Sequence, residues 1–132
     1  GSTSSQESVV GALAQKLSEG GSVAIFPEGR TSTGKEVLPF HGRLLKAAVE
    51  NDYPVQAVAI GFYRDGQLRN HEVAFAPGES FVANFFRILG APALDVGVIC
   101  MPAMRAAGRG RRELAALARD QVVNALDHRC AT

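Results

Sequence analysis

The sequence predicts an α/β domain in which helices flank a layered, mostly parallel sheet that carries one hairpin. Three observations support this fold class. Short apolar runs alternate with longer segments whose apolar residues recur at helical spacing. Glycine and proline separate most of these segments, as expected where helices and strands end. The chain has 132 residues, enough for one core, so a single domain over 1–132 is expected.

The chain opens with a predicted helix and a predicted strand. Ser4 and Glu7 stand at capping-box spacing, apolar residues then recur at helical period up to Leu17, and Gly20-Gly21 ends the helix. The run 23–26 is apolar on both faces, which is typical of a central parallel strand. Ligands of open α/β sheets bind beyond the carboxyl ends of such strands. The segment after residue 26 is therefore the first candidate for a site.

The middle of the chain predicts a helix, a strand and a hairpin. Leucine, alanine and valine at helical spacing predict a helix over about 42–51, and Tyr53-Pro54 ends it because the residue before proline avoids the helical conformation. The apolar run 55–60 predicts a second buried strand. The segment 64–67 carries a hairpin signal, and the returning strand is expected over roughly 71–76.

The last third predicts two more helices around a strand. Ser80 is expected to cap a helix over 81–89, which Gly90 stops. Alternating apolar residues predict a strand over 94–100, and a final helix is expected over about 111–126. Helices thus separate most of the strands, which favours a layered α/β domain.

The composition excludes several classes of protein. An apolar content of 46% and a charged content of 20% are ordinary for a folded domain. A net charge of +1 argues against nucleic-acid binding. Two cysteines form no disulfide framework and suit a reducing compartment, and no apolar run approaches the ~18 residues of a membrane span. No signal peptide is visible, so we expect a cytoplasmic protein, and no metal or bound cofactor is indicated.

The segment after the first predicted strand has the chemistry of an anion site. Gly29 lets backbone N–H groups approach a ligand, Arg30 can bind a phosphate through two hydrogen bonds, and Thr31 adds a hydroxyl donor. The candidate substrate-binding residues are Phe26, Pro27, Glu28, Gly29, Arg30, Thr31 and Ser32. A phosphate ester is the ligand that this pattern favours.

The same segment resembles a known family. Phe26-Pro27-Glu28-Gly29 matches the third conserved block of the glycerolipid acyltransferases, the family of 1-acyl-glycerol-3-phosphate acyltransferases, usually written Phe-Pro-Glu-Gly-Thr-Arg-Ser. The segment 38–40 and Gly42 resemble the residues just downstream of that block in the family, and 53–60 resembles the fourth block with its Pro-Val pair. The resemblance covers nearly all of the chain and is most specific over 23–60.

Three departures from the family pattern matter. The order Arg30-Thr31 reverses the family's Thr-Arg, and one step along an extended segment reverses the side-chain direction. Ala57 replaces the second proline of the fourth block. The family's catalytic His-x-x-x-x-Asp motif lies upstream of the third block, whereas His41, His71 and His128 all lie downstream of it. The chain therefore looks like the C-terminal portion of an acyltransferase domain, without the catalytic residues and inactive alone.

The resemblance implies an O-acyltransferase of membrane phospholipid synthesis. Such an enzyme moves a fatty acyl group from acyl-CoA or acyl-carrier protein, a co-substrate rather than a cofactor, to the hydroxyl of a lysophospholipid. This chain would supply the acceptor-binding half, with Arg30 on the phosphate and Glu28 orienting Arg30, while the missing N-terminal half supplies the base. Secondary candidates for substrate contact are Lys35, His41 and Arg43. Peripheral contact at the cytoplasmic face of the membrane is also implied.

Other interpretations of these residues stay open. The loop can belong to a non-catalytic lipid- or phosphate-binding module, or to an unrelated α/β domain with an accidental turn. His41 fits a partly exposed loop histidine as well as a ligand contact. The acceptor can be lysophosphatidic acid, glycerol 3-phosphate or a lyso-aminolipid.

Two features outside the motif also have alternative explanations. The predicted helix 81–89 is apolar nearly all round, so it is either buried or its Phe85 or Phe86 enters a bilayer. A cluster of arginines over 105–112 is either a solvated linker or a patch for anionic lipid headgroups.

Overall fold

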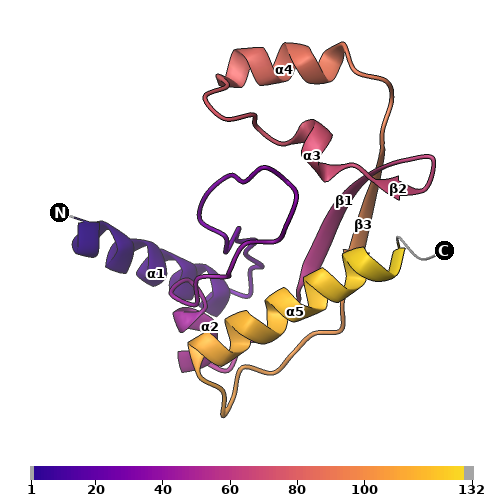
Figure 1. Ribbon diagram of the computed structural model, residues 1–132. Helices are drawn as coiled ribbons and strands as arrows, with labels where there is room; N and C mark the ends of the chain where they lie inside the picture. Colours follow the sequence, from indigo (N-terminus) through magenta and orange to yellow (C-terminus); the bar gives the residue numbers. More distant parts are fainter. Residues whose placement is uncertain (1, 130–132) are drawn as a thin grey trace.

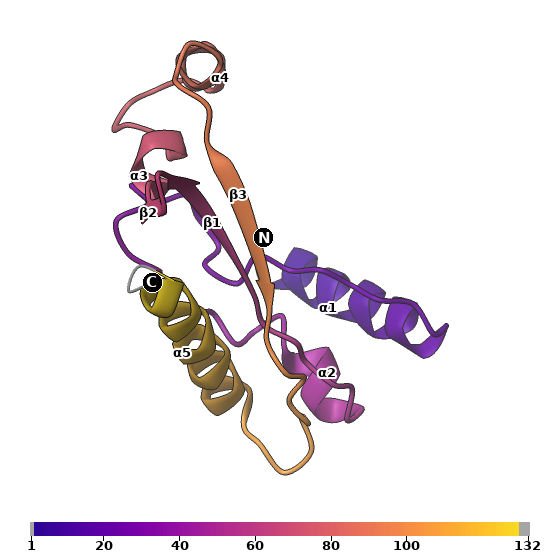
Figure 2. The same cartoon turned by 90° about the vertical axis from the view of Figure 1, so that its right-hand side faces the viewer.

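The computed structural model describes residues 2–129, with the burial of side chains described over 7–127. The helices and strands are, in chain order, α1 (Ser2–Ser18), α2 (Lys46–Glu50), β1 (Val58–Arg64), β2 (Gln67–Leu68), α3 (Asn70–Val73), α4 (Phe81–Leu89), β3 (Asp95–Cys100) and α5 (Arg111–Arg129). In both views α4 forms one end of the molecule, and α5 runs beside the long strands β1 and β3 (Figures 1 and 2).

The sheet has three strands in the order β2-β1-β3, and both pairings are antiparallel. Val58 lies opposite Cys100 and Phe62 opposite Val96. The prediction of a mostly parallel sheet is therefore wrong. A parallel partner for β1 requires the chain to cross back to the start of β1. Here the hairpin, α3 and α4 all stay at the end where β1 finishes, so β3 returns in the opposite direction (Figure 1).

The predicted hairpin is confirmed, but its returning strand is much shorter than expected. Asp65 and Gly66 have φ of 52° and 75°, which suits the tight turn between β1 and β2. Beyond β2, the side-chain oxygen of Asn70 accepts the N–H of Phe62 over 2.8 Å and takes the place of a backbone partner. The ladder ends there, and α3 occupies part of the segment 71–76 that was expected to be strand. His71 therefore lies on a helix and not on a strand face.

The other predicted elements are confirmed in part. The first helix begins at Ser2, before the expected cap, and the strand over 55–60 begins only at Val58. The helix over 42–51 shrinks to α2, with turns before it where Lys46 N–H bonds to Arg43 C=O over 3.2 Å. Gly42 lies against the start of α5, because a Cβ there would lie 2.5 Å from the carbonyl oxygen of Arg111. Helices α4 and α5 and strand β3 lie where they were predicted.

The core lies between α5 and one face of the sheet. Ala57 and Ala59 pack with Met101 against Val122 and Leu126 of α5. A second cluster joins α5 to α2; its buried members are Leu45, Ala48, Ala106, Leu114 and Ala115. Small residues on the sheet allow α5 to approach closely. The burial of these clusters holds α5 in place, and α5 in turn positions the candidate site.

The opposite face of the sheet is apolar and solvent-exposed among the described residues. Side chains that point away from α5 include Val58, Ile60, Val96 and Val98, each 43% to 58% exposed. The register places Ile60 of β1 beside Val98 of β3. Alternation along the two strands explains the two faces, since neighbouring residues point to opposite sides. No helix within 2–129 combines the length and the apolar character that crossing a membrane requires.

Candidate functional site

The segment 23–26, predicted as a central strand, is extended chain outside the sheet, and Phe26 is 82% exposed. A strand needs a neighbour to pair with, and an apolar run cannot specify that neighbour. The turn after this segment is well defined. Gly29 N–H donates to Phe26 C=O over 3.3 Å, with Pro27 in the second position.

Gly29 is required at this turn for two reasons. Its φ of 69° lies in the left-handed region, where glycine is the residue without a steric penalty. A Cβ there would also lie 3.2 Å from Cδ2 of His41. His41 N–H donates to Pro27 C=O over 2.8 Å, so the turn and the histidine are held together. The structure thus brings one of the secondary candidates, His41, against the motif.

The Glu28 carboxylate binds the backbone at Leu38, at the far end of the loop, and does not bind Arg30. Its Oε2 accepts the N–H of Leu38 over 2.9 Å, which closes the loop between residues 28 and 38. No ion pair joins the described side chains of Glu28 and Arg30, so the expected orienting role is not what this geometry supports. The carboxylate is directed at the backbone, which leaves the guanidinium to other partners.

Arg119 of α5 fastens the same end of the loop. Its Nε donates to the carbonyls of Val37 and Leu38, both over 3.1 Å, and its Nη2 donates to Val37 over 2.6 Å. Leu38 is also the residue whose amide binds Glu28. Helix α5 thus reaches the loop through the carbonyl groups of Val37 and Leu38. No pattern in the sequence pointed to this residue, because its partners lie about 80 positions away.

The centre of the loop leaves its polar side chains accessible. Arg30, Thr31 and Lys35 are exposed, and Arg30 forms no hydrogen bond or ion pair with any residue described in the structure. Ser32 Oγ accepts the N–H of Gly34 over 3.2 Å and keeps its own proton for another acceptor. A Cβ at Gly34 would lie 2.7 Å from the carbonyl oxygen of Asn70, so this part of the loop lies against the start of α3.

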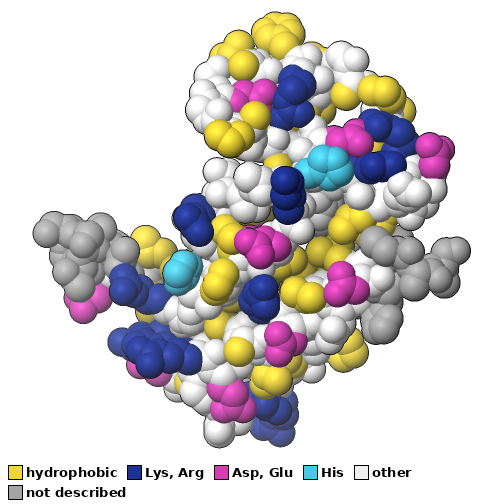
Figure 3. All heavy atoms as spheres, in the orientation of Figure 1, with side chains coloured by type: hydrophobic (Ala, Val, Ile, Leu, Met, Phe, Trp, Pro, Cys, Tyr) yellow, Lys and Arg dark blue, Asp and Glu magenta, His cyan; other side chains and the backbone are white. Residues whose placement is uncertain are grey.

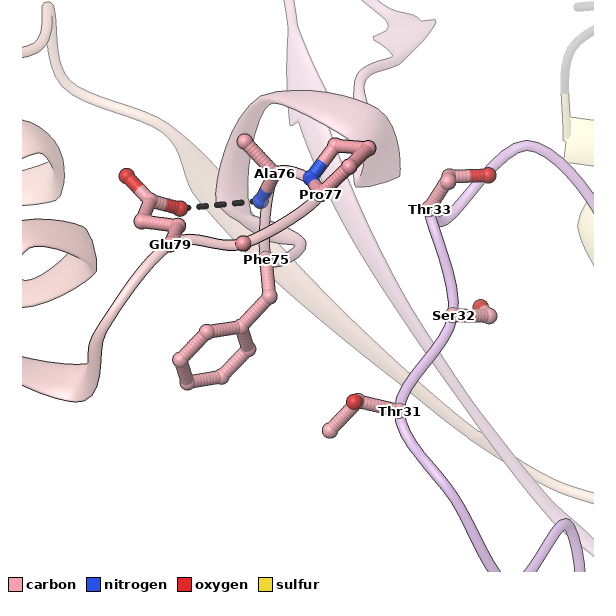
Figure 4. Close-up of a pocket in the computed structure, with 8 residues that line it drawn as sticks. Thr31, Ser32, Thr33, Phe75, Ala76, Pro77 and Glu79 are labelled. Carbon is pink, nitrogen blue, oxygen red and sulfur yellow. Dashed lines mark hydrogen bonds between the residues drawn. The ribbon is translucent and has the colours of Figure 1, made fainter.

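A pocket of about 330 Å³ lies between this loop and the segment before α4. Its lining consists of two short segments, Thr31, Ser32, Thr33 and Phe75, Ala76, Pro77, Gly78, Glu79. Figure 4 shows Thr31 pointing across the pocket toward the Phe75 side. The side chains of Ser32 and Thr33 point away from that side in the same view (Figure 4). One wall thus offers the Thr31 hydroxyl and the other is mainly apolar, an arrangement that suits a ligand with a polar head and an apolar tail.

The wall formed by 75–79 is fastened to α4. Glu79 pairs with Arg87, with Oε1 2.8 Å from Nε and Oε2 3.0 Å from Nη2. Arg87 also donates to the carbonyl of Ala74 over 2.7 Å. Asn84, the buried polar residue of α4, donates to Glu79 Oε2 over 3.1 Å. The hydrogen bond from Arg87, followed by those from the Ala76 and Asn84 amides, lowers the pKa of Glu79 from 4.5 to about 2.

We expect Glu79→Gln to flatten the acid dependence of stability. Because the folded-state pKa of Glu79 is depressed, its stabilising contribution is complete above pH 4.5 and is lost as the pH falls toward about 2. The difference in free energy of unfolding between the two proteins should therefore shrink over that window. Urea unfolding at a series of pH values measures this difference.

Arg87→Met tests whether the pairing with Arg87 causes the low pKa of Glu79. It should flatten the same part of the profile, and the double variant should flatten it no further, because both changes remove one pair. Parallel stability curves for the original chain and Glu79→Gln would show that the Glu79–Arg87 pair does not control this titration.

Comparison with known proteins shows which family the sequence matches. A family model described as Acyltransferase matches residues 1–61, which include the turn, Arg30 and the hydroxyl residues. The chain is 34% identical to a lyso-ornithine lipid O-acyltransferase of Pseudomonas aeruginosa over 114 residues, 86% of this chain and 44% of that protein. The chain belongs to the glycerolipid acyltransferase family.

Further relatives support the same assignment. The chain is 35% identical over 65 residues to the 1-acyl-sn-glycerol-3-phosphate acyltransferases of Neisseria gonorrhoeae and Neisseria meningitidis serogroup B, 49% of this chain and 26% of each relative. The chain thus spans less than half the length of these curated relatives. No solved structure matches it.

In this acyltransferase chain the predicted site residues separate into two groups. The structure brings Pro27 and Gly29 against His41, and it brings Thr31 and Ser32 to the pocket. Arg30, Lys35 and Arg43 are exposed and do not line that pocket. The second wall and Arg119 were missed.

Proposed function

We propose that this chain supplies the acceptor-binding part of an O-acyltransferase that esterifies a lysophospholipid. The observation that carries the proposal is Arg30, an exposed guanidinium without a protein partner among the described residues, which directly precedes the pocket-lining residues Thr31 and Ser32 in the chain. A guanidinium in this setting can bind a phosphate through two parallel hydrogen bonds. The relatives named for lysolipid and acyl-glycerol-phosphate acylation support the same class of acceptor.

The chemistry assigns separate tasks to the chain and to the rest of the enzyme. The acceptor hydroxyl oxygen bonds to the thioester carbonyl carbon, the carbon–sulfur bond breaks, and a base takes the hydroxyl proton and returns one to the leaving thiolate. The sequence holds no His-x-x-x-x-Asp motif to act as that base. We therefore place the base in a missing N-terminal half, with acyl-CoA or acyl-carrier protein as the donor.

Within the proposed acceptor site, the residues of this chain orient the lysolipid. Arg30 would hold the phosphate, and Thr31 and Ser32 would add hydroxyl hydrogen bonds. Glu28, held by the Leu38 amide, keeps its charge on the backbone and so reduces repulsion of the anion. The apolar wall at Phe75 and Pro77 would take the part of the lipid next to the head group. We place the enzyme at the cytoplasmic face of the membrane, where such lipids lie.

Replacement of Arg30 by alanine should weaken binding of a short-chain, water-soluble lysophosphatidic acid by roughly 10- to 100-fold, because a charge-assisted pair is lost. Isothermal titration calorimetry on the 132-residue chain measures this change. Lys46→Ala is the matched control, since Lys46 is an exposed cation on α2 that pairs with Glu50. Equal affinity for the original chain and Arg30→Ala would contradict the role given to Arg30.

The same titration separates the possible acceptors. A short-chain lyso-ornithine lipid is the second ligand to test, because the relative that aligns with 86% of this chain is named for that acceptor. Tighter binding of this ligand than of lysophosphatidic acid would assign the chain to the lyso-aminolipid class. A non-catalytic lipid- or phosphate-binding module remains the alternative, and the coding sequence before Gly1 discriminates, since the enzyme requires a His-x-x-x-x-Asp motif there.

A further inference from the structure

Helix α4 presents its apolar face to solvent and its polar face to the protein. Asn84 is buried and Arg87 is paired with Glu79 on the inner side. The outer side carries five large apolar residues at helical spacing, each 49% to 73% exposed: Phe81, Val82, Phe85, Phe86 and Leu89. A helix that packs on a core in water has the opposite arrangement. The outer face of α4 is therefore built to contact something apolar.

The helix is held firmly in this orientation. Ser80 Oγ accepts the N–H of Ala83 over 3.2 Å and caps the first turn. The Glu79–Arg87 pair and Asn84 fix the inner face to the segment before the helix. Outside, the rings of Phe81 and Phe85 stack with centroids 6.5 Å apart, and Phe86 meets Phe85 edge-on at 5.8 Å. The three rings thus already contact one another in the free chain, which lowers the entropic cost of burying them.

The position of α4 indicates what covers this face. The helix forms one end of the molecule in both ribbon views, and hydrophobic side chains gather along that end in Figure 3. The pocket wall 75–79 leads directly into α4, so the exposed face is continuous with the proposed acceptor site. The relatives are named for acceptors that are themselves lipids. The surface next to the pocket must therefore meet the medium from which a lipid arrives.

We propose that the outer face of α4 inserts into the interfacial region of a phospholipid bilayer and so places the pocket at the membrane surface. The role for the pocket rests on the proposed function, whereas the insertion of α4 does not. Arg87 is the charged residue of α4, and Glu79 neutralises it. Insertion is therefore driven by apolar burial and needs no anionic lipid. The arginines over 105–112 lie just before α5 and at its start, at the opposite end of the molecule from α4, and cannot contact the same surface (Figure 1).

The absence of tryptophan from the sequence allows a direct test. Phe85→Trp introduces one fluorophore on the outer face of α4. With phosphatidylcholine vesicles that contain no lysolipid, we expect its emission to shift to shorter wavelength and to be quenched by brominated acyl chains. Phe40→Trp is the matched control, because Phe40 packs against the core clusters and should not respond. Unchanged emission of Phe85→Trp on addition of vesicles would overturn the proposal.

Loss-of-binding variants test the same face without a probe. Phe85→Ser with Phe86→Ser should lower the vesicle partition coefficient roughly tenfold or more, since two exposed rings lose their burial in lipid. The matched pair Val96→Ser with Val98→Ser, on the exposed sheet face, should leave partitioning unchanged. Circular dichroism confirms that both variants are folded. If the sheet-face pair abolishes binding and the α4 pair does not, the surface has been assigned to the wrong element.

Two further outcomes are decisive. High salt should leave binding to phosphatidylcholine vesicles intact, and its loss at high salt would overturn apolar insertion. A shift of the Phe85→Trp emission with protein concentration alone, with no further change on adding vesicles, would show that a second copy of the chain covers α4. Failure of the acceptor titration in solution would remove the proposed function and leave vesicle insertion standing, so the two failures are distinguishable.

Discussion

Replacing Arg119 by alanine is expected to lower the free energy of unfolding by about 2 to 4 kcal/mol, because the carbonyls of Val37 and Leu38 lose their donors in a partly buried place. The effect should reach the site, since Leu38 also binds Glu28. Urea unfolding measures the loss of stability. Hydrogen exchange of the Leu38 amide measures the loosening of the loop, and this amide should exchange faster than in the original chain.

Arg112→Ala is the matched control for Arg119→Ala. Arg112 lies on the same helix and is exposed, so its removal should change the free energy of unfolding by no more than about 0.5 kcal/mol. If Arg119→Ala is as stable as Arg112→Ala, the bonds to Val37 and Leu38 contribute nothing. If it is less stable but Leu38 exchanges at the original rate, then Arg119 stabilises α5 without holding the loop.

Replacing Leu114 by alanine should lower the free energy of unfolding by about 2 to 5 kcal/mol, because the change leaves a cavity in the cluster that joins α5 to α2. Leu114 is the large side chain with no exposed surface among the described residues. Leu89→Ala makes the same chemical change at an exposed position on α4 and should cost less than about 0.5 kcal/mol. Similar denaturant midpoints for the two variants would contradict the burial of Leu114.

The elements that the sequence predicted well depend on local signals. Ser80 caps α4 as expected, because the side chain of a capping residue binds an amide three positions on. Asp65 and Gly66 form the predicted turn, since both adopt the positive φ that such a turn requires. Helix α5 follows its apolar stripe. In each case the atoms that decide the structure lie within a few residues of one another.

The errors concern partners that are distant in sequence. The run 23–26 has the composition of a buried strand, but a strand exists only where another strand supplies its hydrogen bonds. The direction of β3 depends on the end of the sheet at which the chain lies after α4. The spacing of apolar residues does not predict that end. Asn70, next to the segment predicted as a returning strand, ends the ladder by bonding to Phe62.

The wall of the pocket formed by residues 31–33 was predictable from the sequence, whereas the wall formed by 75–79 was not. The sequence pointed to Arg30, Thr31 and Ser32 because the hydrogen-bonding groups of each side chain follow from the residue type alone. The opposing segment 75–79 consists of ordinary residues that become a wall only when the chain folds back. The Arg30 side chain is exposed, and the titrations determine which acceptor it binds.

The antiparallel sheet has one more consequence, for how the chain behaves at high concentration. In the order β2-β1-β3, the strand β3 has no neighbour on its outer side among the described residues, so a row of backbone donors and acceptors faces solvent there. Its side chains Val96 and Val98 add an apolar surface, and Asp95 is its one charge. Natural edge strands usually carry lysine, proline or a bulge that prevents pairing with another chain. Strand β3 has neither lysine nor proline, so two chains that meet edge to edge can extend one another's sheets. Aggregation should therefore increase steeply as the protein concentration rises.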